Sequence, residues 1–330
     1  MRYKAFGNTG MEVSEMSLGS WGIGGAGWDD HTEEERLDAI HAAVECGINF
    51  IDTAPAYNAG VAEQYVGKAL KEMGSRDKVA VATKCGTFRI NDRYVRNNAP
   101  DAVIGQCEES LRNLQTDYID LYLVHWPDAK VPIQETMEAL VKLKEQGKIL
   151  HIGVCNFSPE EILEAEQVCP VEAYQLQYSM VMRSAQSALQ WAADRGMGVM
   201  TYGSLGGGIL TGRYRQLTGF AEDDNRNRFY QHFKEPMFSR IMELLKVMDV
   251  MAAEKDVSLS QIALNWSSQR PFISTCIVGA QKRSRILQNT AAYDWQLSKE
   301  EAALLDAAIG KYLGCEDENG FLEQPKDVIR

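Results

Sequence analysis

The chain has 330 residues, of which 45% are hydrophobic and 24% are charged, as in a soluble globular protein with a sizeable core. Its formal net charge of −12 argues against nucleic acid or an anionic membrane surface as a partner. The sequence shows no secretory signal and no apolar run of about 18 residues, so we expect no membrane-spanning segment.

The cysteines and histidines form neither a disulfide framework nor a metal-binding pattern. The seven cysteines are odd in number and scattered, without a C-x-x-C pair, and the five histidines are scattered as well. Such cysteines are typical of reduced thiols, which predicts a cytoplasmic protein. We predict no metal site.

Predicted strands and helices alternate along the chain. Residues 3–14 predict a β-hairpin with its turn at residues 7–10, and Thr32 and Ser158 each open a capping box at a helix start. The predicted strands are residues 16–18, 48–51, 79–84, 118–124, 149–154, 171–176, 199–202 and 275–278. A helix is predicted after each strand, for example at about 62–72, 133–146 and 281–291.

The eight predicted strands are apolar along most of their length, which indicates a parallel sheet covered on both faces. Eight strand–helix units in about 290 residues match a closed (β/α)8 TIM barrel, and no linker-like stretch divides residues 1–330, which predicts one domain. An open doubly wound sheet would instead need a glycine-rich loop at a helix start. The one match, Gly22–Gly27, is followed by Asp29 and Asp30, which would repel a pyrophosphate.

Two segments depart from this repeat. Residues 203–235 show no clear element and contain Gly206–Gly208, so we expect a long loop after the seventh strand, as a lid or a disordered insertion. Extra C-terminal helices are predicted at about 237–253 and 258–268. The tail beyond Leu313 lacks periodicity, and together with the lid it is expected to shape a substrate pocket.

The chemistry is expected where a buried strand ends at Asp52 and a phenol follows at Tyr57. In a barrel of this class the reactive groups lie at the carboxyl ends of the strands. The predicted strand ends carry Asp52, Lys84, His125, Asn156, Gln175 and Tyr202. So many polar residues at the ends of apolar strands favour a shared site over unrelated turn caps.

Lys84 is the residue on which the expected chemistry depends. A lysine that ends an apolar strand needs a partner, and Asp52 on the preceding strand end is placed to pair with it. A lysine beside a phenol lowers the pKa of that phenol from about 10, which would make Tyr57 a general acid–base near neutral pH. His125 can hydrogen-bond a substrate carbonyl from the other side. Because no serine or cysteine is poised as a nucleophile, hydride from a bound cofactor fits the site.

Short motifs along the chain support this chemistry. They are Asp52–Tyr57, Thr83–Lys84, Leu123–His125, Gly153–Ser158, Tyr202–Gly208, Val278–Ala280 and Gln288–Asn289. Together they resemble the aldo-keto reductase superfamily, in particular bacterial reductases of the inositol-catabolism and general-stress type and, more distantly, the β-subunits of potassium channels. The resemblance runs from Tyr3 to Leu297 and implies an NAD(P)H-dependent carbonyl reductase on a (β/α)8 barrel.

The resemblance also implies roles for individual residues. Tyr57 would donate the proton and His125 would orient the carbonyl, while Asp52 and Lys84 would tune the phenol. The implied substrate-binding residues are Trp21, Tyr57, His125 and Trp126. The implied cofactor-binding residues are Gly19, Ser20, Trp21, Asp52, Cys155, Asn156, Gln175, Tyr202, Gly203, Ser204, Leu205, Gly206, Gly208, Gly279, Ala280, Gln281, Lys282, Arg285, Gln288 and Asn289.

Some of these residues have a specific implied contact. Asn156 and Gln175 match positions that hold the nicotinamide carboxamide, and Tyr202 matches an aromatic that stacks on the ring. Cys155 stands where the family carries a serine. A thiol is a weaker hydrogen-bond partner, which puts the strength of that contact in doubt.

The predicted cofactor is NADPH, with NADH as the alternative. Lys282, Arg283 and Arg285 crowd the start of the helix after the last strand, where cations oppose the helix dipole unless an anion binds there. By resemblance this helix lies where the family binds the 2′-phosphate of NADPH, and Arg285 falls on a position often used for it.

Two other functions fit parts of the same pattern. A Schiff-base aldolase would carry its lysine where Lys84 lies, although pairing with Asp52 would keep that lysine protonated. The resemblance to channel subunits supports, as the second alternative, a redox-sensing, cofactor-binding regulatory protein with little turnover. In the favoured interpretation the partner is a small-molecule carbonyl compound, such as a sugar-derived aldehyde.

Overall fold

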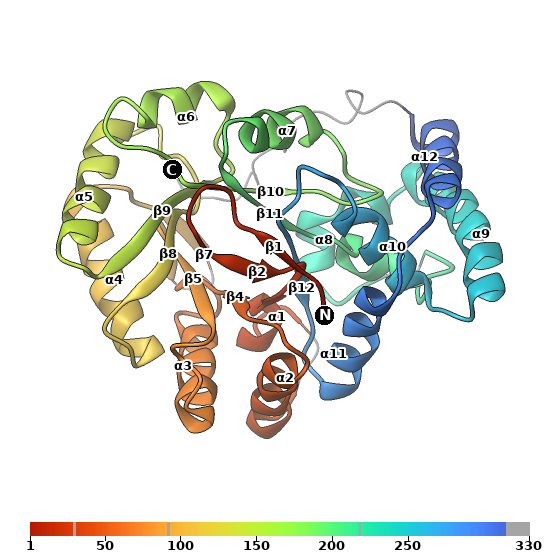
Figure 1. The fold of residues 1–330 in the computed structure, drawn as a ribbon, viewed down its shortest axis with the longest axis horizontal. Coiled ribbons are helices and arrows are strands. Elements are labelled where there is room, and N and C mark those ends of the chain that lie inside the picture. Colours follow the sequence, from red (N-terminus) through yellow and green to blue (C-terminus); the bar gives the residue numbers. More distant parts are fainter. Residues whose placement is uncertain (29–30, 91–92, 218, 223, 315–330) are drawn as a thin grey trace.

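The structure is a computed structural model that describes residues 1–28, 31–90, 93–217, 219–222 and 224–314. Parallel strands form a closed barrel, shown in Figure 1, and confirm the predicted (β/α)8 fold. In order around the barrel these strands are β3 (Met16–Gly19), β4 (Phe50–Asp52), β5 (Ala80–Cys85), β8 (Ile119–Val124), β9 (Ile149–Cys155), β10 (Ala173–Gln177), β11 (Gly198–Tyr202) and β12 (Thr275–Gly279).

Helices follow the strands and cover the barrel. The helices of the repeat are α2 (Glu33–Glu45), α3 (Val61–Met73), α4 (Pro100–Leu114), α5 (Ile133–Glu145), α6 (Pro159–Ala165), α7 (Gln186–Asp194) and α11 (Arg283–Thr290). The additional helices are α1 (Trp21–Gly24), α8 (Asn225–Phe229), α9 (Met237–Lys255), α10 (Leu259–Ser268) and α12 (Lys299–Leu313), with 3-10 helices η1 (Gly206–Thr211), η2 (Gln231–Phe233) and η3 (Ala291–Asp294). No helix within the described residues has both the length and the apolar character needed to cross a bilayer.

The helix starts predicted from the sequence are confirmed by their caps. The side chains of Thr32 and Ser158 each accept a hydrogen bond, at 3.2 Å, from the backbone N–H three residues further on. The carboxylates of Glu35 and Glu161 in turn accept a hydrogen bond from the backbone N–H of the capping residue, which completes both capping boxes. These caps fix where α2 and α6 begin, and therefore where the preceding loops end.

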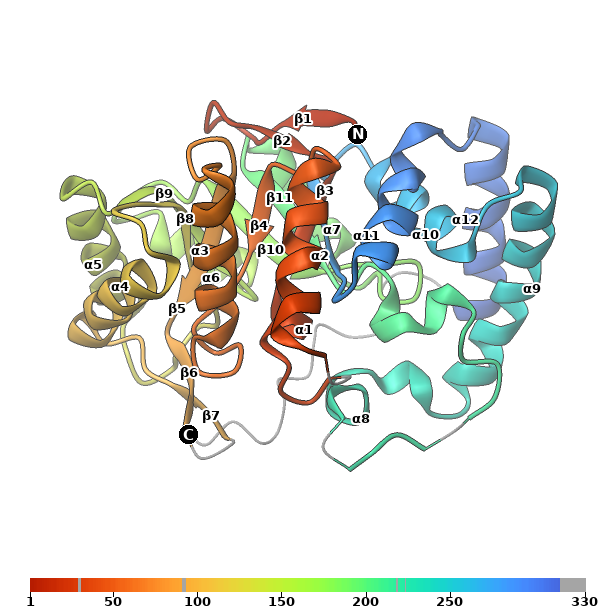
Figure 2. The same cartoon turned by 90° about the horizontal axis from the view of Figure 1, so that it is seen from below.

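The barrel interior is filled by apolar side chains and is closed at one end by the N-terminal hairpin. β1 (Tyr3–Ala5) and β2 (Glu12–Ser14) pair antiparallel, and Figure 2 shows them at the end of the barrel opposite α8. Phe6, which follows β1, is fully buried and packs on Phe50 with ring centroids 5.4 Å apart. A separate apolar layer lies between the barrel and its helices. Since the hairpin closes the amino-terminal end, a binding site must open at the carboxyl ends of the strands.

The sequence analysis does not predict one element near that open end. An antiparallel hairpin of β6 (Thr87–Ile90) and β7 (Arg93–Arg96) follows β5. Its two strands pair with each other and form a sheet separate from the barrel. Without a face on the barrel core, the hairpin lacks the continuous apolar pattern that marks the barrel strands.

The expectation that residues 203–235 contain no clear element is wrong. This segment contains η1, α8 and η2, which are too short for helical periodicity to indicate them. Asp224 caps the start of α8, and its carboxylate accepts a hydrogen bond of 2.8 Å from the Arg226 N–H. Asp29 and Asp30 lie outside the described residues, as does the tail at 315–330, which the sequence analysis expects to shape the pocket.

The contact between α3 and α4 yields a stability prediction. At Gly67 in α3 an added Cβ would lie 2.5 Å from the backbone carbonyl carbon of Leu114 in α4. Gly67→Ala should therefore destabilise the protein by about 1–3 kcal/mol, because the backbone it meets cannot move aside alone. The measurement is the urea midpoint of unfolding.

Gly105→Ala is the matched control. Gly105 lies inside α4, and an added Cβ there would meet nothing within 4 Å. The same substitution should be neutral or should stabilise the protein by about 0.5–1 kcal/mol, because alanine is the better helix former. A Gly67 variant as stable as the Gly105 variant would contradict the close packing of α3 on α4.

Candidate active site

The register of the barrel brings residues that are far apart in the sequence to one rim. Gly19 at the end of β3 pairs with Asp52 at the end of β4, and Gln175 in β10 pairs with Cys155 at the end of β9. Lys84 lies on β5, and His125 and Asn156 directly follow β8 and β9. The predicted strand-end residues therefore surround a common space.

Asp52, Lys84 and Tyr57 are in direct contact. The Lys84 ammonium lies 2.7 and 2.8 Å from the two Asp52 carboxylate oxygens, 2.9 Å from the carbonyl oxygen of Thr53 and 3.2 Å from the Tyr57 hydroxyl. The side chains of Lys84 and Asp52 are 0% and 2% exposed. A lysine so enclosed, with its protons shared among acceptors, is poorly placed to be the nucleophile of a Schiff-base aldolase.

The expectation that Lys84 lowers the pKa of Tyr57 is wrong. Burial raises the pKa of the Tyr57 phenol well above its usual value, and the negative charge of Asp52 raises it further. Because Asp52 offsets the charge of Lys84, the lysine does not outweigh burial. Tyr57 therefore keeps its proton at neutral pH, as a proton donor must.

His125 is held as a neutral imidazole beside Tyr57. The two rings meet edge to face with centroids 6.0 Å apart. Burial lowers the pKa of His125 well below its usual value, and the charges of Lys84 and Arg96 lower it further. The backbone carbonyl of His125 accepts a hydrogen bond of 3.0 Å from the Asn156 amide, which fixes the loop after β8.

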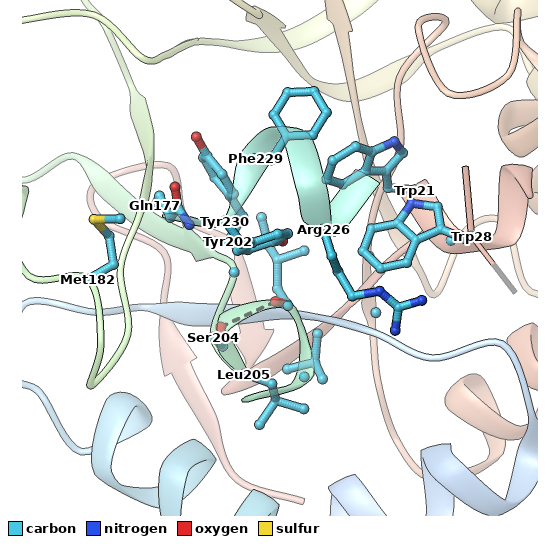
Figure 3. A pocket seen from close by; sticks show the side chains of 18 of the residues that line it. Trp21, Trp28, Gln177, Met182, Tyr202, Ser204, Leu205, Arg226, Phe229 and Tyr230 are labelled. Atoms are coloured by element: carbon cyan, nitrogen blue, oxygen red, sulfur yellow. Dashed lines mark hydrogen bonds between the residues drawn. The ribbon is translucent and has the colours of Figure 1, made fainter. Parts of the chain in front are cut away.

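A cavity of about 1510 Å³ opens above these residues. Three predicted site residues do not line this cavity, namely Lys84, Ser20 and Gly206, and all three are buried. The other predicted site residues form part of its wall. Figure 3 shows Trp21 and Trp28 on one side of this cavity and Gln177 and Met182 on the other. Trp21 also stacks on Tyr57, with centroids 6.1 Å apart, so it covers the phenol.

The side-chain amides of Gln175 in β10 and of Asn156 after β9 are held by hydrogen bonds to neighbouring side chains. The Gln175 amide donates to Asp52 at 2.8 Å, and Cys155 donates to the Gln175 carbonyl at 3.4 Å. Asn156, in a left-handed backbone conformation with φ 61°, accepts a bond of 2.9 Å from the Tyr202 hydroxyl. Burial raises the pKa of the Cys155 thiol, so this cysteine acts here as a neutral donor.

A glycine turn and the start of α11 form another part of the wall. Gly206, Gly207 and Gly208 take positive φ angles of 56°, 63° and 98°, and a Cβ on Gly207 would lie 2.9 Å from the Tyr230 ring. His232 lies behind this turn, with a ring nitrogen 2.9 Å from the Gly206 carbonyl oxygen. The turn therefore requires glycine and is held from behind by η2.

The basic residues at the start of α11 do not all face the cavity. Lys282 and Arg285 line the cavity wall, with Lys282 also 3.3 Å from Glu35. Arg283 instead pairs with Asp38 and Glu45 of α2, at 2.8 and 2.7 Å. The predicted basic cluster is thus divided between the cavity and the outer helix layer.

Sequence analysis misses several residues of the wall. They are Trp28, Tyr94, Arg96, Arg213, Arg226, Phe229 and Tyr230. Most lie in the loop after β11, where α8 is attached to the loop after β3 by a bond of 3.1 Å from the Asn225 N–H to the Gly27 carbonyl. The sequence of these loops shows no periodic apolar pattern. Only its aromatic residues and arginines could have indicated that the loops line a binding site.

The chain is similar in sequence and in fold to known reductases and dehydrogenases. The chain is 38% identical over 303 residues to the aldo-keto reductase YhdN of Bacillus subtilis, covering 91% of each chain. It is 32% identical over 323 residues to the NADH-specific methylglyoxal reductase of Escherichia coli, covering 92% of this chain and 97% of that protein. Among solved structures, the glycerol dehydrogenase AKR11B4 from Gluconobacter oxydans matches with a TM-score of 0.87 at 30% identity, covering 97% of this chain and 98% of that chain.

The sequence also matches a model of a protein family. The model of the aldo/keto reductase family matches residues 15–309, which include the whole barrel from β3 to α11. Together with relatives that align over nearly the full chain, this match shows that the protein belongs to the aldo/keto reductase family, whose members are oxidoreductases that use nicotinamide cofactors.

Proposed function

We propose that this protein reduces a small aldehyde or ketone to an alcohol and that Tyr57 supplies the proton. The observation that carries the proposal is the chain of contacts at the cavity floor. There Lys84 lies 3.2 Å from the Tyr57 hydroxyl and 2.7 Å from Asp52. Related proteins named as a methylglyoxal reductase and a glycerol dehydrogenase support a small carbonyl or alcohol as the substrate class.

The cavity fits a nicotinamide dinucleotide together with a substrate. Its volume of about 1510 Å³ exceeds the roughly 300–1,000 Å³ of ordinary small-molecule pockets. Asn156 and Gln175 bring amide groups to the cavity wall, which suit a carboxamide, and Gly208 and Arg285 in the same wall suit phosphates. When bound in its reduced form, the cofactor supplies a hydride to the carbonyl carbon.

The protein's own residues supply the proton. Tyr57, protonated at neutral pH, donates its hydroxyl proton to the carbonyl oxygen. Lys84 stabilises the negative charge that develops on the phenol oxygen, and Asp52 holds Lys84 in position. Neutral His125 hydrogen-bonds the same carbonyl oxygen, and Trp21 covers Tyr57 against water.

Replacing the phenol tests its role as proton donor. Tyr57→Phe removes the hydroxyl alone, so cofactor binding should survive, while kcat should fall by about 10²–10⁴, the usual contribution of a positioned general acid. The measurement is steady-state oxidation of the cofactor with a panel of aldehydes and ketones. Tyr65→Phe is the control, because Tyr65 lies in α3 away from the cavity wall.

Two outcomes would speak against this role. A Tyr57→Phe variant with most of its activity would move proton donation to another group, with His125 as the next candidate. Wild-type turnover below about one per minute on every carbonyl tested, against the usual 1–10³ per second, would instead favour the redox-sensing regulatory protein.

The pKa directions predict the pH profile of reduction. A proton donor works while it is protonated, so activity is lost only as the pH rises through its pKa, which is raised for Tyr57. A neutral imidazole persists above its pKa, which is lowered for His125. We therefore expect kcat/KM for reduction to stay flat between about pH 6 and 9. A decline with a midpoint near pH 8 would show that Lys84 acidifies Tyr57 after all.

Cofactor choice is proposed to be NADPH, with Arg285 binding the 2′-phosphate. Loss of one charge-assisted hydrogen bond costs about 1.5–3 kcal/mol, so Arg285→Ala should weaken NADPH binding by roughly ten- to a hundredfold and leave NADH nearly unchanged. Binding is measured by quenching of protein fluorescence. Arg283→Ala is the control, because Arg283 pairs with Asp38 and Glu45 outside the cavity.

The control should leave the affinity for both cofactors unchanged. Equal weakening of NADPH and NADH by Arg285→Ala, or tighter wild-type binding of NADH, would refute the assignment. The second result would place the protein beside its NADH-specific relative from Escherichia coli.

A further inference from the structure

The hairpin β6–β7 places an arginine beside the loop that carries His125. Arg96, the last residue of β7, lines the cavity wall. Its guanidinium carbon lies 4.9 Å from the centre of the Trp126 ring, and it donates a hydrogen bond of 3.5 Å to the carbonyl of Pro127. Both contacts are to the residues that directly follow His125. The guanidinium therefore lies at the carbonyl end of the cavity.

Electrostatics place the Arg96 charge close to the reacting centre as well. After burial and Lys84, Arg96 is the third influence that lowers the pKa of His125. The Lys84 ammonium is paired with Asp52 at 2.7 Å. Arg96 is thus a second cation near His125, and it comes from the hairpin β6–β7 and not from a barrel strand.

The cavity as a whole favours anions, although the protein is acidic. Its cationic lining residues are Arg96, Arg213, Arg226, Lys234, Lys282 and Arg285. Among the described residues of the wall, Asp52 is the sole carboxylate, and it is paired with Lys84. Within a chain of net charge −12, such a wall concentrates anions in the cavity.

Some of these cationic side chains have other proposed or observed interactions. Lys282 caps the start of α11 and Arg285 lies in its first turn, where the proposed cofactor phosphate would bind. Arg226 is held by Asp224 at 2.5 Å and packs over Phe220. Arg96 lies on a different element from these residues, next to Trp126 and the loop that carries His125.

We propose that the preferred substrates carry a carboxylate or phosphate group in addition to the carbonyl, and that Arg96 binds this anionic group. This inference rests on the proposed reductase function. The planar guanidinium can bind either anion with two parallel hydrogen bonds, which a point charge cannot do. Tyr94 and Trp126 line the same cavity and add aromatic surface for the body of the substrate.

A purely structural role of Arg96 is the competing explanation. Its guanidinium lies over the Trp126 ring, and such a contact could stabilise the loop after β8. In that case loss of Arg96 would impair the reduction of charged and neutral substrates alike. The two explanations therefore differ in the ratio of the two activities and not in their absolute values.

The test compares matched carbonyl pairs with the full-length protein and NADPH. One pair is para-carboxybenzaldehyde and its neutral methyl ester, and the other is glyceraldehyde phosphate and glyceraldehyde. The readout is the ratio of kcat/KM for the anionic and the neutral member. The variants are Arg96→Met, Arg96→Lys and the control Arg89→Met, because Arg89 carries the same charge on the paired strand β6 but does not line the cavity.

We expect the wild type to prefer the anionic member of at least one pair by tenfold or more. Arg96→Met should lower that ratio by about ten- to a hundredfold, Arg96→Lys should lower it less, and Arg89→Met should leave it unchanged. The pair that shows the preference identifies carboxylate or phosphate as the preferred group. No preference in the wild type, or an equal fall for both members in Arg96→Met, would overturn the proposal.

A binding measurement separates this proposal from the reductase function itself. If no carbonyl of either pair is reduced, the proposed function fails. Benzoate and inorganic phosphate can still be titrated against tryptophan fluorescence, since Trp126 lies beside Arg96. Binding of one of them that weakens tenfold or more in Arg96→Met, but not in Arg89→Met, supports the anion site. Equal affinities in all variants reject it.

Discussion

The buried ion pair of Lys84 and Asp52 is the interaction on which the rest of the site depends. With exposures of 0% and 2%, neither charge could be tolerated alone at this depth. The barrel meets this requirement through register: Asp52 at the end of β4 pairs with Ala82, two residues before Lys84. The Thr53 carbonyl and the Gln175 amide supply further hydrogen bonds to the pair. A slip of either strand by one residue would turn one partner away from the interior.

The same pair sets the protonation of the groups above it. The Asp52 carboxylate lies nearer to the Lys84 ammonium than the phenol does, at 2.7 Å against 3.2 Å, so it offsets the charge of the lysine. Burial therefore dominates the pKa of Tyr57 and raises it. His125 loses its charge for the related reason that a buried imidazolium beside Lys84 is unfavourable. In the proposed reaction, a protonated phenol and a neutral imidazole face one carbonyl oxygen. Proton donation would then start from neutral groups, and the charge that develops on the phenol would meet an ammonium already in position.

The parts that sequence could predict are those that the barrel core dictates. Strands buried on both faces are apolar along most of their length, so a polar residue such as Asp52 or Lys84 near a strand end stands out. The sequence does not show how deeply Tyr57 is buried. For that reason it predicts a lowered pKa for this phenol, whereas burial raises the pKa. Trp28 and Phe229 were missed because loop residues follow no period. Their places depend on contacts such as the one between Asn225 and Gly27, which join loops about 200 residues apart.

The barrel strands and the hairpin β6–β7 differ in how freely their side chains can change. Asp52 and Lys84 lie on strands whose register the whole barrel enforces, whereas β6 and β7 pair only with each other among the described strands. The hairpin meets the loop after β8 through Arg96, which contacts Trp126 and Pro127. A change of side chain at this position would alter the charge that a substrate meets without moving Asp52 or Lys84. In the proposed function, recognition of the substrate and proton donation to it are therefore carried by elements that can change independently, although they share one cavity.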